Sequence, residues 1–249
     1  MNDKIAWVTG AGSGIGEHTA IHLSEAGFTV ILSGRTRESL EDVSTKCQGN
    51  SSVKVLDVSN SDEVKRVFLE IIREFKKIDV LIASAGVNTP KRNWHNISYE
   101  DFDKVIKIDL NGIFYTNQLV LKKMKEQKSG LIVNISSWAG KYVSTLTGPA
   151  YTSAKHAVNA LTESINMEAG HFGVRACAFC PGEVATPILD KRPIPVSKED
   201  KEKMVQPEDC AKTIVFLSQL PSRVCINEIT ISPTWNRDYV SRLTDQVPS

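Results

Sequence analysis

A tyrosine and a lysine stand four residues apart in the segment Tyr151-Thr-Ser-Ala-Lys155. On a helix, residues at this spacing share one face, so the lysine ammonium can lie beside the tyrosine phenol. A free tyrosine loses its proton near pH ~10, but a neighbouring cation favours the phenolate form. Such a phenol can exchange a proton with a substrate oxygen near neutral pH. On spacing alone, two solvated side chains on a helix surface are the alternative.

A glycine-rich turn near the N-terminus has a pattern that binds phosphate groups. Residues Thr9–Gly16 read Thr-Gly-Ala-Gly-Ser-Gly-Ile-Gly, between a strand-like run and a helical segment. Glycines at such a turn let the backbone approach a pyrophosphate, and the free N–H groups of the helix N-terminus bind its charge. The position after the first strand of a βαβ unit favours a dinucleotide site over a tight turn without a ligand.

Short apolar, β-branched runs alternate with helical segments along the chain. The runs are Ile5–Thr9, Thr29–Ser33, Val53–Val58, Val80–Ala83, Leu131–Ser136, Val174–Cys180 and Ile226–Ile231. They are continuous, which is typical of strands buried on both faces of a parallel sheet. The helical segments include Asp62–Phe75, about Tyr99–Gln127, about Ala150–His171 and one that begins at Pro207. We therefore expect an α/β fold, a doubly wound parallel seven-stranded sheet (a Rossmann fold), formed by residues 1–249 as a single domain.

One segment interrupts this alternation. Residues 186–206 contain Pro187, Pro193 and Pro195, followed by the charged run Lys198–Lys203. Long insertions in compact domains often cover a site, so residues 187–206 are a candidate substrate flap. A solvated surface insertion is the alternative.

Composition excludes several classes of function. The 249 residues carry 30 basic and 29 acidic side chains, and a net charge of +1 gives no field for nucleic acid or an anionic membrane. No apolar run approaches the roughly 18 residues of a membrane helix, and the N-terminal residues have no signal-peptide architecture. We expect a cytoplasmic protein without nucleic-acid or membrane partners. Cys177 and Cys180 have CxxC spacing, but no second pair completes a four-thiolate site, so no metal centre is predicted.

In their order, these motifs resemble the short-chain dehydrogenase/reductase family, in its compact single-domain branch. The matching segments are Thr9–Gly16, Tyr151–Lys155 and Ser137-Trp-Ala-Gly140. The resemblance implies an oxidoreductase that interconverts a carbonyl and a secondary alcohol by hydride transfer with a nicotinamide dinucleotide. Tyr151 is then the acid/base, Lys155 tunes it and binds the cofactor ribose, and Ser137 holds the substrate oxygen. Relatives of this length form homo-oligomers, so a homotetramer or a dimer is expected.

The same resemblance implies a set of cofactor-binding residues. They are Gly10, Ser13, Gly14, Ile15 and Gly16 in the glycine turn, and Asp57, Val58, Ala85, Gly86, Pro181, Gly182, Val184 and Thr186 after later strands, together with Tyr151 and Lys155. In the family, the Pro-Gly-x-Val-x-Thr segment meets the nicotinamide carboxamide and the aspartate after the third strand touches adenine. A solvated turn residue is the alternative for Asp57.

Two segments depart from the family pattern. Ser84-Ala85-Gly86 stands where the usual pattern is Asn-Asn-Ala-Gly. Asp109, in Asp109-Leu-Asn111-Gly112, occupies the position of the active-site Asn in the family's Asn-x-x-Gly pattern. In the family, the backbone carbonyl at this position holds a water that links to the lysine, and an aspartate retains that carbonyl. We therefore include Asp109 among the catalytic residues; Asn111 lies about 200° away around a helix.

The choice of cofactor depends on the residue after the second strand. An acid there would bind the adenosine ribose hydroxyls and repel a 2′-phosphate, but the chain has Ser33-Gly34-Arg35. Arg35 can form charge-assisted bonds to a phosphate, which favours NADP(H) over NAD(H). The rival function is a non-catalytic dinucleotide-binding redox sensor or subunit. Asp109 is the feature in its favour, and the intact Ser137, Tyr151 and Lys155 argue against it.

The substrate itself is not identified by these motifs. Side chains that can line a pocket of mixed polarity are Trp94, His95, Trp138, Tyr142, Leu146 and those of the flap. Lys191 and Arg192 can meet an anionic substrate, and a solvated flap is the alternative reading of that pair.

Overall fold

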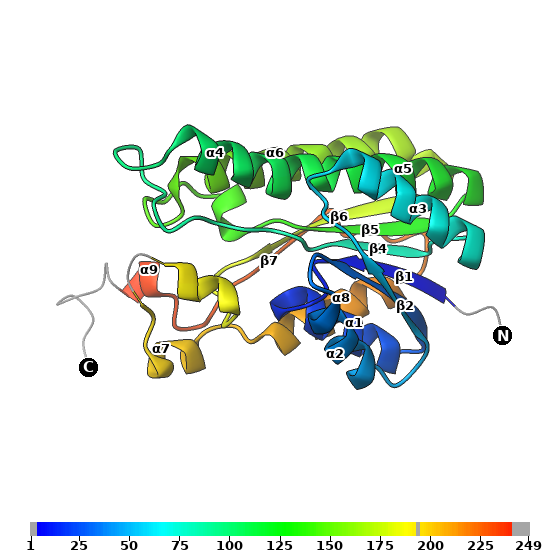
Figure 1. Cartoon of the computed structure of the whole chain (residues 1–249), viewed down its shortest axis with the longest axis horizontal. Helices are drawn as coiled ribbons and strands as arrows, with labels where there is room; N and C mark the ends of the chain where they lie inside the picture. Colours follow the sequence, from blue (N-terminus) through cyan, green and yellow to red (C-terminus); the bar gives the residue numbers. More distant parts are fainter. Residues whose placement is uncertain (1–3, 193–194, 241–249) are drawn as a thin grey trace.

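Seven strands form one parallel sheet in a computed structural model that describes residues 4–192 and 195–240 (Figure 1). The strands are β1 (Lys4–Thr9), β2 (Phe28–Gly34), β3 (Ser51–Val55), β4 (Val80–Ala83), β5 (Gly130–Ile135), β6 (Val174–Pro181) and β7 (Glu228–Ile231). Their order in the sheet is β3-β2-β1-β4-β5-β6-β7, and each neighbouring pair is parallel. The chain reverses its direction of winding between β1 and β4. The predicted doubly wound Rossmann fold in a single domain is confirmed.

Helices cover both faces of the sheet (Figure 1). One face carries α1 (Gly14–Glu25), α2 (Arg37–Lys46) and α8 (Pro207–Gln219). The opposite face carries α3 (Ser61–Phe75), α4 (Tyr99–Ile106), α5 (Gly112–Gln127) and α6 (Gly148–Ala169). None of the helices in the described part of the chain is long and apolar enough to cross a membrane.

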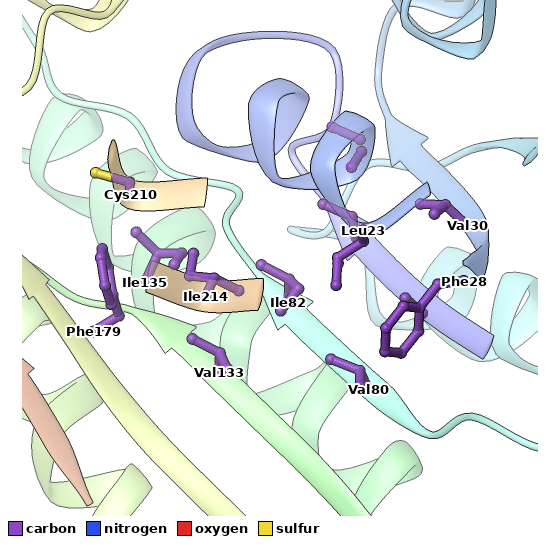
Figure 2. Close-up of a cluster of buried hydrophobic side chains, with 14 of the residues drawn as sticks. Leu23, Phe28, Val30, Val80, Ile82, Val133, Ile135, Phe179, Cys210 and Ile214 are labelled. Carbon is purple, nitrogen blue, oxygen red and sulfur yellow. The ribbon is translucent and has the colours of Figure 1, made fainter. Parts of the chain in front are cut away.

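Two hydrophobic cores hold these layers together because alternate side chains of each strand point to opposite faces. In β1, Ala6 and Val8 enter one core, and Ile5 and Trp7 enter the other. Figure 2 shows the first core, where Leu23 of α1 and Ile214 of α8 face the side chains of the central strands. Leu23 and Ile214 are fully buried, and burying such a side chain contributes about 1.5–3 kcal/mol.

The outer strands differ from the prediction of burial on both faces, which is wrong for β3 and β7. All five residues of β3 are half-buried, and β7 alternates between exposed and half-buried residues. Both strands lie at the edges of the sheet, where helices cover them less completely. The third strand also ends earlier than predicted, at Val55 rather than Val58. Asp57 turns the chain there, since its carboxylate accepts hydrogen bonds from the Ser59 N–H and hydroxyl at 2.9 and 2.8 Å.

The predicted long helical stretch over 99–127 is confirmed, but its middle is not α-helical. Between α4 and α5 lies η1 (Lys107–Asn111), one turn of π-helix that holds Asp109. A π-turn inserts an extra residue and frequently marks a functional site. The candidate flap, 187–206, contains η4 (Pro187–Lys191, a 3₁₀ turn) and the short helix α7 (Lys198–Lys203). Its residues 193 and 194 lie outside the described residues, and its role as a flap stays a prediction. After β7, α9 (Arg237–Val240) is the last described element.

Candidate active site

A cavity of about 400 Å³ opens at the carboxyl ends of the strands, beside the point where the winding reverses. In open α/β sheets, ligands bind at this position. Its lining includes these predicted residues: Gly10, Ser13, Gly14, Ile15, Arg35, Asp57, Val58, Ala85, Gly86, Ser137, Tyr151, Lys155, Pro181, Gly182, Val184 and Thr186. Gly16 and Asp109 do not line it. The structure thus brings together residues that are up to 176 positions apart in the sequence, from Gly10 to Thr186.

The glycine turn brings bare backbone to one end of the cavity. Gly10 has φ +66°, and a Cβ there would lie 2.7 Å from the backbone nitrogen of Ala85. Gly14 has φ +58°, and its Cβ would lie 3.1 Å from the Thr186 side chain. A side chain at Gly16 would overlap the Gly10 carbonyl. Ser13, Gly14 and Ile15, at the N-terminus of the 12-residue helix α1, line the cavity, and a helix N-terminus at this place fits the pyrophosphate of a dinucleotide.

The Thr9 hydroxyl, at the end of β1, binds the backbone of Ser84 and Ala85. This segment stands where the family pattern has Asn-Asn-Ala-Gly. Thr9 is 2% exposed, and its Oγ1 accepts hydrogen bonds from the backbone nitrogens of Ser84 and Ala85 at 3.2 and 3.5 Å. The next residue, Gly86, lies so close to Asp109 that a Cβ would be 3.1 Å from Oδ2. Ser84, Ala85 and Gly86 all line the cavity, so a ligand there can contact this segment.

The structure places the tyrosine and lysine of α6 side by side. Lys155 Nζ lies 5.4 Å from the centre of the Tyr151 ring, and it donates a 2.9 Å hydrogen bond to the carbonyl of Ile135 at the end of β5. Lys155 is 3% exposed. Burial works to lower the pKa of Lys155, but the Asp109 carboxylate and the Tyr151 oxygen outweigh it, so this pKa lies above its ordinary value. The ammonium stays charged next to the phenol.

Asp109 lies behind this pair, in the π-turn. It is fully buried; Oδ1 accepts a 2.8 Å hydrogen bond from the Val87 N–H, and Oδ2 lies 3.4 Å from Lys155 Nζ. Oδ2 has no hydrogen-bond partner among the described residues. Burial raises the pKa of Asp109, and the Lys155 ammonium opposes that rise. Neither Asp109 nor Asn111 lines the cavity, but Asp109 contacts two residues that do, Lys155 and Val87.

The two serines after β5 have different surroundings. Ser136 is 2% exposed, and its hydroxyl donates a 3.1 Å hydrogen bond to the Lys155 carbonyl, which ties β5 to α6. Ser137 is extended, at φ −166°, and its Oγ accepts a 3.1 Å hydrogen bond from the Ala139 N–H. Both line the cavity. Because Ser137 Oγ acts as an acceptor in this bond, its O–H can donate to a substrate oxygen.

The far end of the cavity suits an adenosine group. Arg35 is exposed, directly follows β2 and lines the cavity. Asp57 also lines this end, although its carboxylate already accepts the two Ser59 hydrogen bonds. Asp57 therefore holds the turn after β3, as the alternative prediction has it, and it also lies where it can contact a ligand.

The lining also includes polar residues that the motifs do not identify as site residues: Asn88, Arg92, Glu183 and Asn236. Trp138 and Leu146 line the cavity as predicted, whereas Trp94, His95 and Tyr142 do not. Glu183 occupies the variable position of the Pro-Gly-x-Val-x-Thr segment, and Arg92 lies in a loop without a motif. The charge of Glu183, directly after Pro181-Gly182, could have indicated a site residue in the sequence. Nothing in the sequence around Arg92 indicates a site residue.

Comparison with known proteins gives the family. Residues 4–194 match the family model described as short chain dehydrogenase. An uncharacterised oxidoreductase of Staphylococcus aureus (strain MW2) is 36% identical over 235 residues, which cover 94% of this chain and 98% of that protein.

Solved structures agree with that match over nearly the whole chain. The alcohol dehydrogenase of the archaeon Thermococcus sibiricus, complexed with 5-hydroxy-NADP, has a TM-score of 0.84 at 28% identity, covering 94% of this chain and 98% of that one. The closed form of serine dehydrogenase, complexed with NADP+, has a TM-score of 0.84 at 27% identity, covering 98% of both chains. This chain therefore belongs to the short chain dehydrogenase family of oxidoreductases.

Proposed function

We propose that this chain interconverts a carbonyl and a secondary alcohol, with NADP(H) as the hydride carrier. The observation that carries the proposal is one cavity lined by the glycine turn of α1 and by Ser137, Tyr151 and Lys155. Further support comes from two structural neighbours, an alcohol dehydrogenase complexed with 5-hydroxy-NADP and a serine dehydrogenase complexed with NADP+.

Each side chain has a distinct part in the proposed reaction. A bound nicotinamide supplies the two-electron chemistry, because its C4 accepts a hydride from an alcohol carbon or donates one to a carbonyl carbon. Ser137 donates a hydrogen bond to the substrate oxygen and orients it. In oxidation, the Tyr151 phenolate takes the hydroxyl proton; in reduction, the phenol returns it to the oxygen. Lys155, 5.4 Å from the tyrosine ring, favours the phenolate.

Arg35 is the basis for preferring NADP(H). Its guanidinium follows β2 at the adenosine end of the cavity, where it can form charge-assisted hydrogen bonds to a 2′-phosphate. An aspartate or glutamate at that strand end would instead favour the free ribose hydroxyls of NAD(H).

The test is the loss of NADPH absorbance with a panel of aldehydes and ketones, for wild type and Tyr151→Phe. Removing the phenol oxygen should lower kcat by about 10²–10⁴-fold, the contribution of a positioned acid/base, and leave the dissociation constant of NADPH nearly unchanged. Tyr99→Phe is the matched control, because Tyr99 is 89% exposed and outside the cavity. Wild-type turnover in Tyr151→Phe would contradict the mechanism; NADPH binding without turnover of any carbonyl would favour the redox sensor.

A further inference from the structure

Glu183 binds two arginines that come from different parts of the chain. Its carboxylate accepts hydrogen bonds from Arg237 Nε and Nη2 at 2.8 and 2.6 Å, the bidentate arrangement that an arginine favours. Arg192 Nη1 donates a third hydrogen bond at 2.7 Å. Burial works to raise the pKa of Glu183, but the two arginines outweigh it, so this pKa lies below its ordinary value. The side chain therefore carries a negative charge at neutral pH.

The two arginines share one oxygen of Glu183. Arg192 Nη1 and Arg237 Nη2 both donate to Oε1, at 2.7 and 2.6 Å. Their like charges thus lie close together, and the carboxylate between them offsets the repulsion. The side chains of Glu183 and Arg192 are only 20% and 12% exposed, so water screens this arrangement less than it screens an ion pair on the open surface.

Each of the three segments that meet at this carboxylate supplies part of the cavity wall. Glu183, two residues after β6, lines the cavity itself. Arg192 directly follows η4, and residues 187–189 of η4 line the cavity together with it. Arg237 begins α9 and directly follows the lining residue Asn236. The hydrogen bonds of Glu183 therefore join three parts of one wall.

The backbone of Glu183 is held independently of the arginines. Its carbonyl accepts a 3.1 Å hydrogen bond from the Val205 N–H, and the neighbouring Gly182 N–H donates one of 2.7 Å to the Ile231 carbonyl in β7. The turn after β6 is thus fixed to the edge of the sheet by its backbone. From this fixed point, the Glu183 side chain reaches the other two segments.

More exposed ion pairs extend the arrangement to α7. Lys201 of α7 donates a 3.0 Å hydrogen bond to Asp190 of η4, and Asp200 of α7 lies 3.7 Å from Arg237. The helix α7 therefore contacts both segments that Glu183 holds. Loss of the central carboxylate should loosen α7 as well.

We propose that Glu183 is a positioning residue: its carboxylate fixes η4 and the start of α9 against the turn after β6, and so sets the shape of this wall. The proposal rests on the proposed function, because in that reaction the nicotinamide and the substrate share the space that the wall borders. Ser137, Tyr151 and Lys155 belong to the end of β5 and to α6. A displaced wall should therefore weaken binding more than it slows the chemical step.

Glu183→Gln is the first test, in the steady-state reduction of a carbonyl that the wild type turns over. The amide keeps the size of the side chain, but it loses the charge and places an N–H donor where one oxygen accepted hydrogen bonds. KM should rise about tenfold and kcat should fall less than about threefold, the loss of one charge-assisted hydrogen bond. Glu74→Gln is the matched control and should leave KM unchanged, because Glu74 pairs with Lys54 at 2.7 Å outside the cavity lining.

Arg192→Gln separates positioning from a direct part in the chemistry. It should raise KM as well, and the double variant should be no worse than Glu183→Gln alone, because groups that act through one contact are not additive. Independent, additive effects of the two substitutions would overturn the proposal. So would a loss of kcat of about 10²-fold in Glu183→Gln that Arg192→Gln does not share, since that is the mark of an acid/base.

Limited digestion with trypsin tests the same contacts without turnover. Trypsin cleaves after the lysines of α7, which are Lys198, Lys201 and Lys203. In Glu183→Gln and Arg192→Gln, cleavage there should be about tenfold faster than in wild type, because proteolysis follows the population of the opened segment. The urea midpoint of both variants should change little, since the cores of the fold are untouched. If Glu183→Gln does not fold, Arg192→Gln carries the same test.

The digestion also separates this proposal from the redox reaction. Unchanged cleavage of α7 in both variants would overturn the positioning role of Glu183 and leave the proposed reaction standing. Faster cleavage in both, in a protein whose wild type turns over no carbonyl, would support the contacts of Glu183 and refute the proposed reaction.

Discussion

The Asp109 carboxylate and the Lys155 ammonium form a buried ion pair, with Oδ2 and Nζ 3.4 Å apart. Burying two charges is costly, yet removing one partner costs more, because the other charge is left uncompensated. Asp109 does not line the cavity but contacts Lys155 and Val87, which do, so in the proposed reaction it is a positioning residue. Its negative charge also opposes the effect of Lys155 on the Tyr151 phenol.

Asp109→Asn therefore tests this pair through the pH dependence of alcohol oxidation. The variant removes a negative charge behind Lys155, which favours the phenolate, so the acid limb of kcat/KM should move to lower pH by about one unit. Stability should fall by about 3 kcal/mol, because the buried ammonium loses its partner. The measurement is a pH–rate profile with thermal unfolding of the same samples.

A purely structural role for Asp109 would lower stability or activity without moving that limb. Asp103→Asn is the control, since Asp103 lies on the exposed side of α4 and outside the cavity. A shift of the limb to higher pH in Asp109→Asn would contradict the electrostatic argument.

Single residues also show the limit of sequence reasoning in this chain. The motifs predicted most of the residues at both ends of the cavity, because each follows a strand whose end the apolar runs locate. Arg92 could not be predicted, because its place in the cavity lining depends on a loop folded against Gly148. Glu183 lies in a predicted motif, but its ion pairs could not be predicted. Its partners Arg192 and Arg237 lie 9 and 54 residues further along the chain, outside any motif.

Among the elements, the contact between the loop after β4 and the start of α6 is the tightest close to the site. Gly148 has φ +75°, a conformation that favours glycine, and its missing side chain makes room for the Arg92 carbonyl. Pro149 follows in the first helical turn, where its ring fits without loss of a hydrogen bond. Substitution of Gly148 therefore affects both the backbone conformation and the position of the loop.

Gly148→Ala should lower the free energy of unfolding by about 2–4 kcal/mol, from backbone strain together with steric overlap, and raise KM for the substrate more than it lowers kcat. The measurements are urea unfolding and steady-state kinetics. Gly27→Ala is the matched control: Gly27 has φ +86°, but a Cβ there would meet nothing within 4 Å. It should cost only about 1 kcal/mol with unchanged kinetics. Equal effects of the two variants would exclude a role for the loop contact.

The sequence predicted the bounds of strands and helices correctly where an apolar run coincides with a buried element. It did not predict local departures such as a π-turn. The apolar runs predicted β4 with its observed bounds and β1 to within one residue. The apolar pattern of 99–127 predicted a helix but not η1, because a single π-turn is a local change of one residue that an irregular apolar pattern does not reveal. The incomplete burial of β3 and β7 depends on the order of strands in the sheet, which the pattern of each strand alone does not contain.

For the whole molecule, the winding of the sheet divides the cavity between two halves. The glycine turn and the ends of β2 and β3 supply the proposed adenosine end, whereas β4, β5, β6 and α6 supply the reacting end. A dinucleotide that spans both halves ties them together only in the folded state. Cofactor binding should therefore stabilise the entire fold, since a ligand that binds only the native state shifts the unfolding equilibrium. The homotetramer or dimer expected from the family resemblance stays a prediction.

Thermal unfolding with each cofactor tests this coupling together with the preference for NADP(H). At about 100 times its dissociation constant, NADP+ should add about 2.7 kcal/mol, which raises Tm by about 5–10 °C for a chain of this size. Arg35→Ala should weaken NADP+ binding about tenfold and so halve that rise at the same concentration, while the rise with NAD+ stays unchanged. Arg37→Ala is the control, because Arg37 is a nearby exposed arginine that pairs with Glu41. Equal losses with both cofactors in Arg35→Ala would mean that Arg35 contacts a group common to both, and the preference for the 2′-phosphate would be wrong.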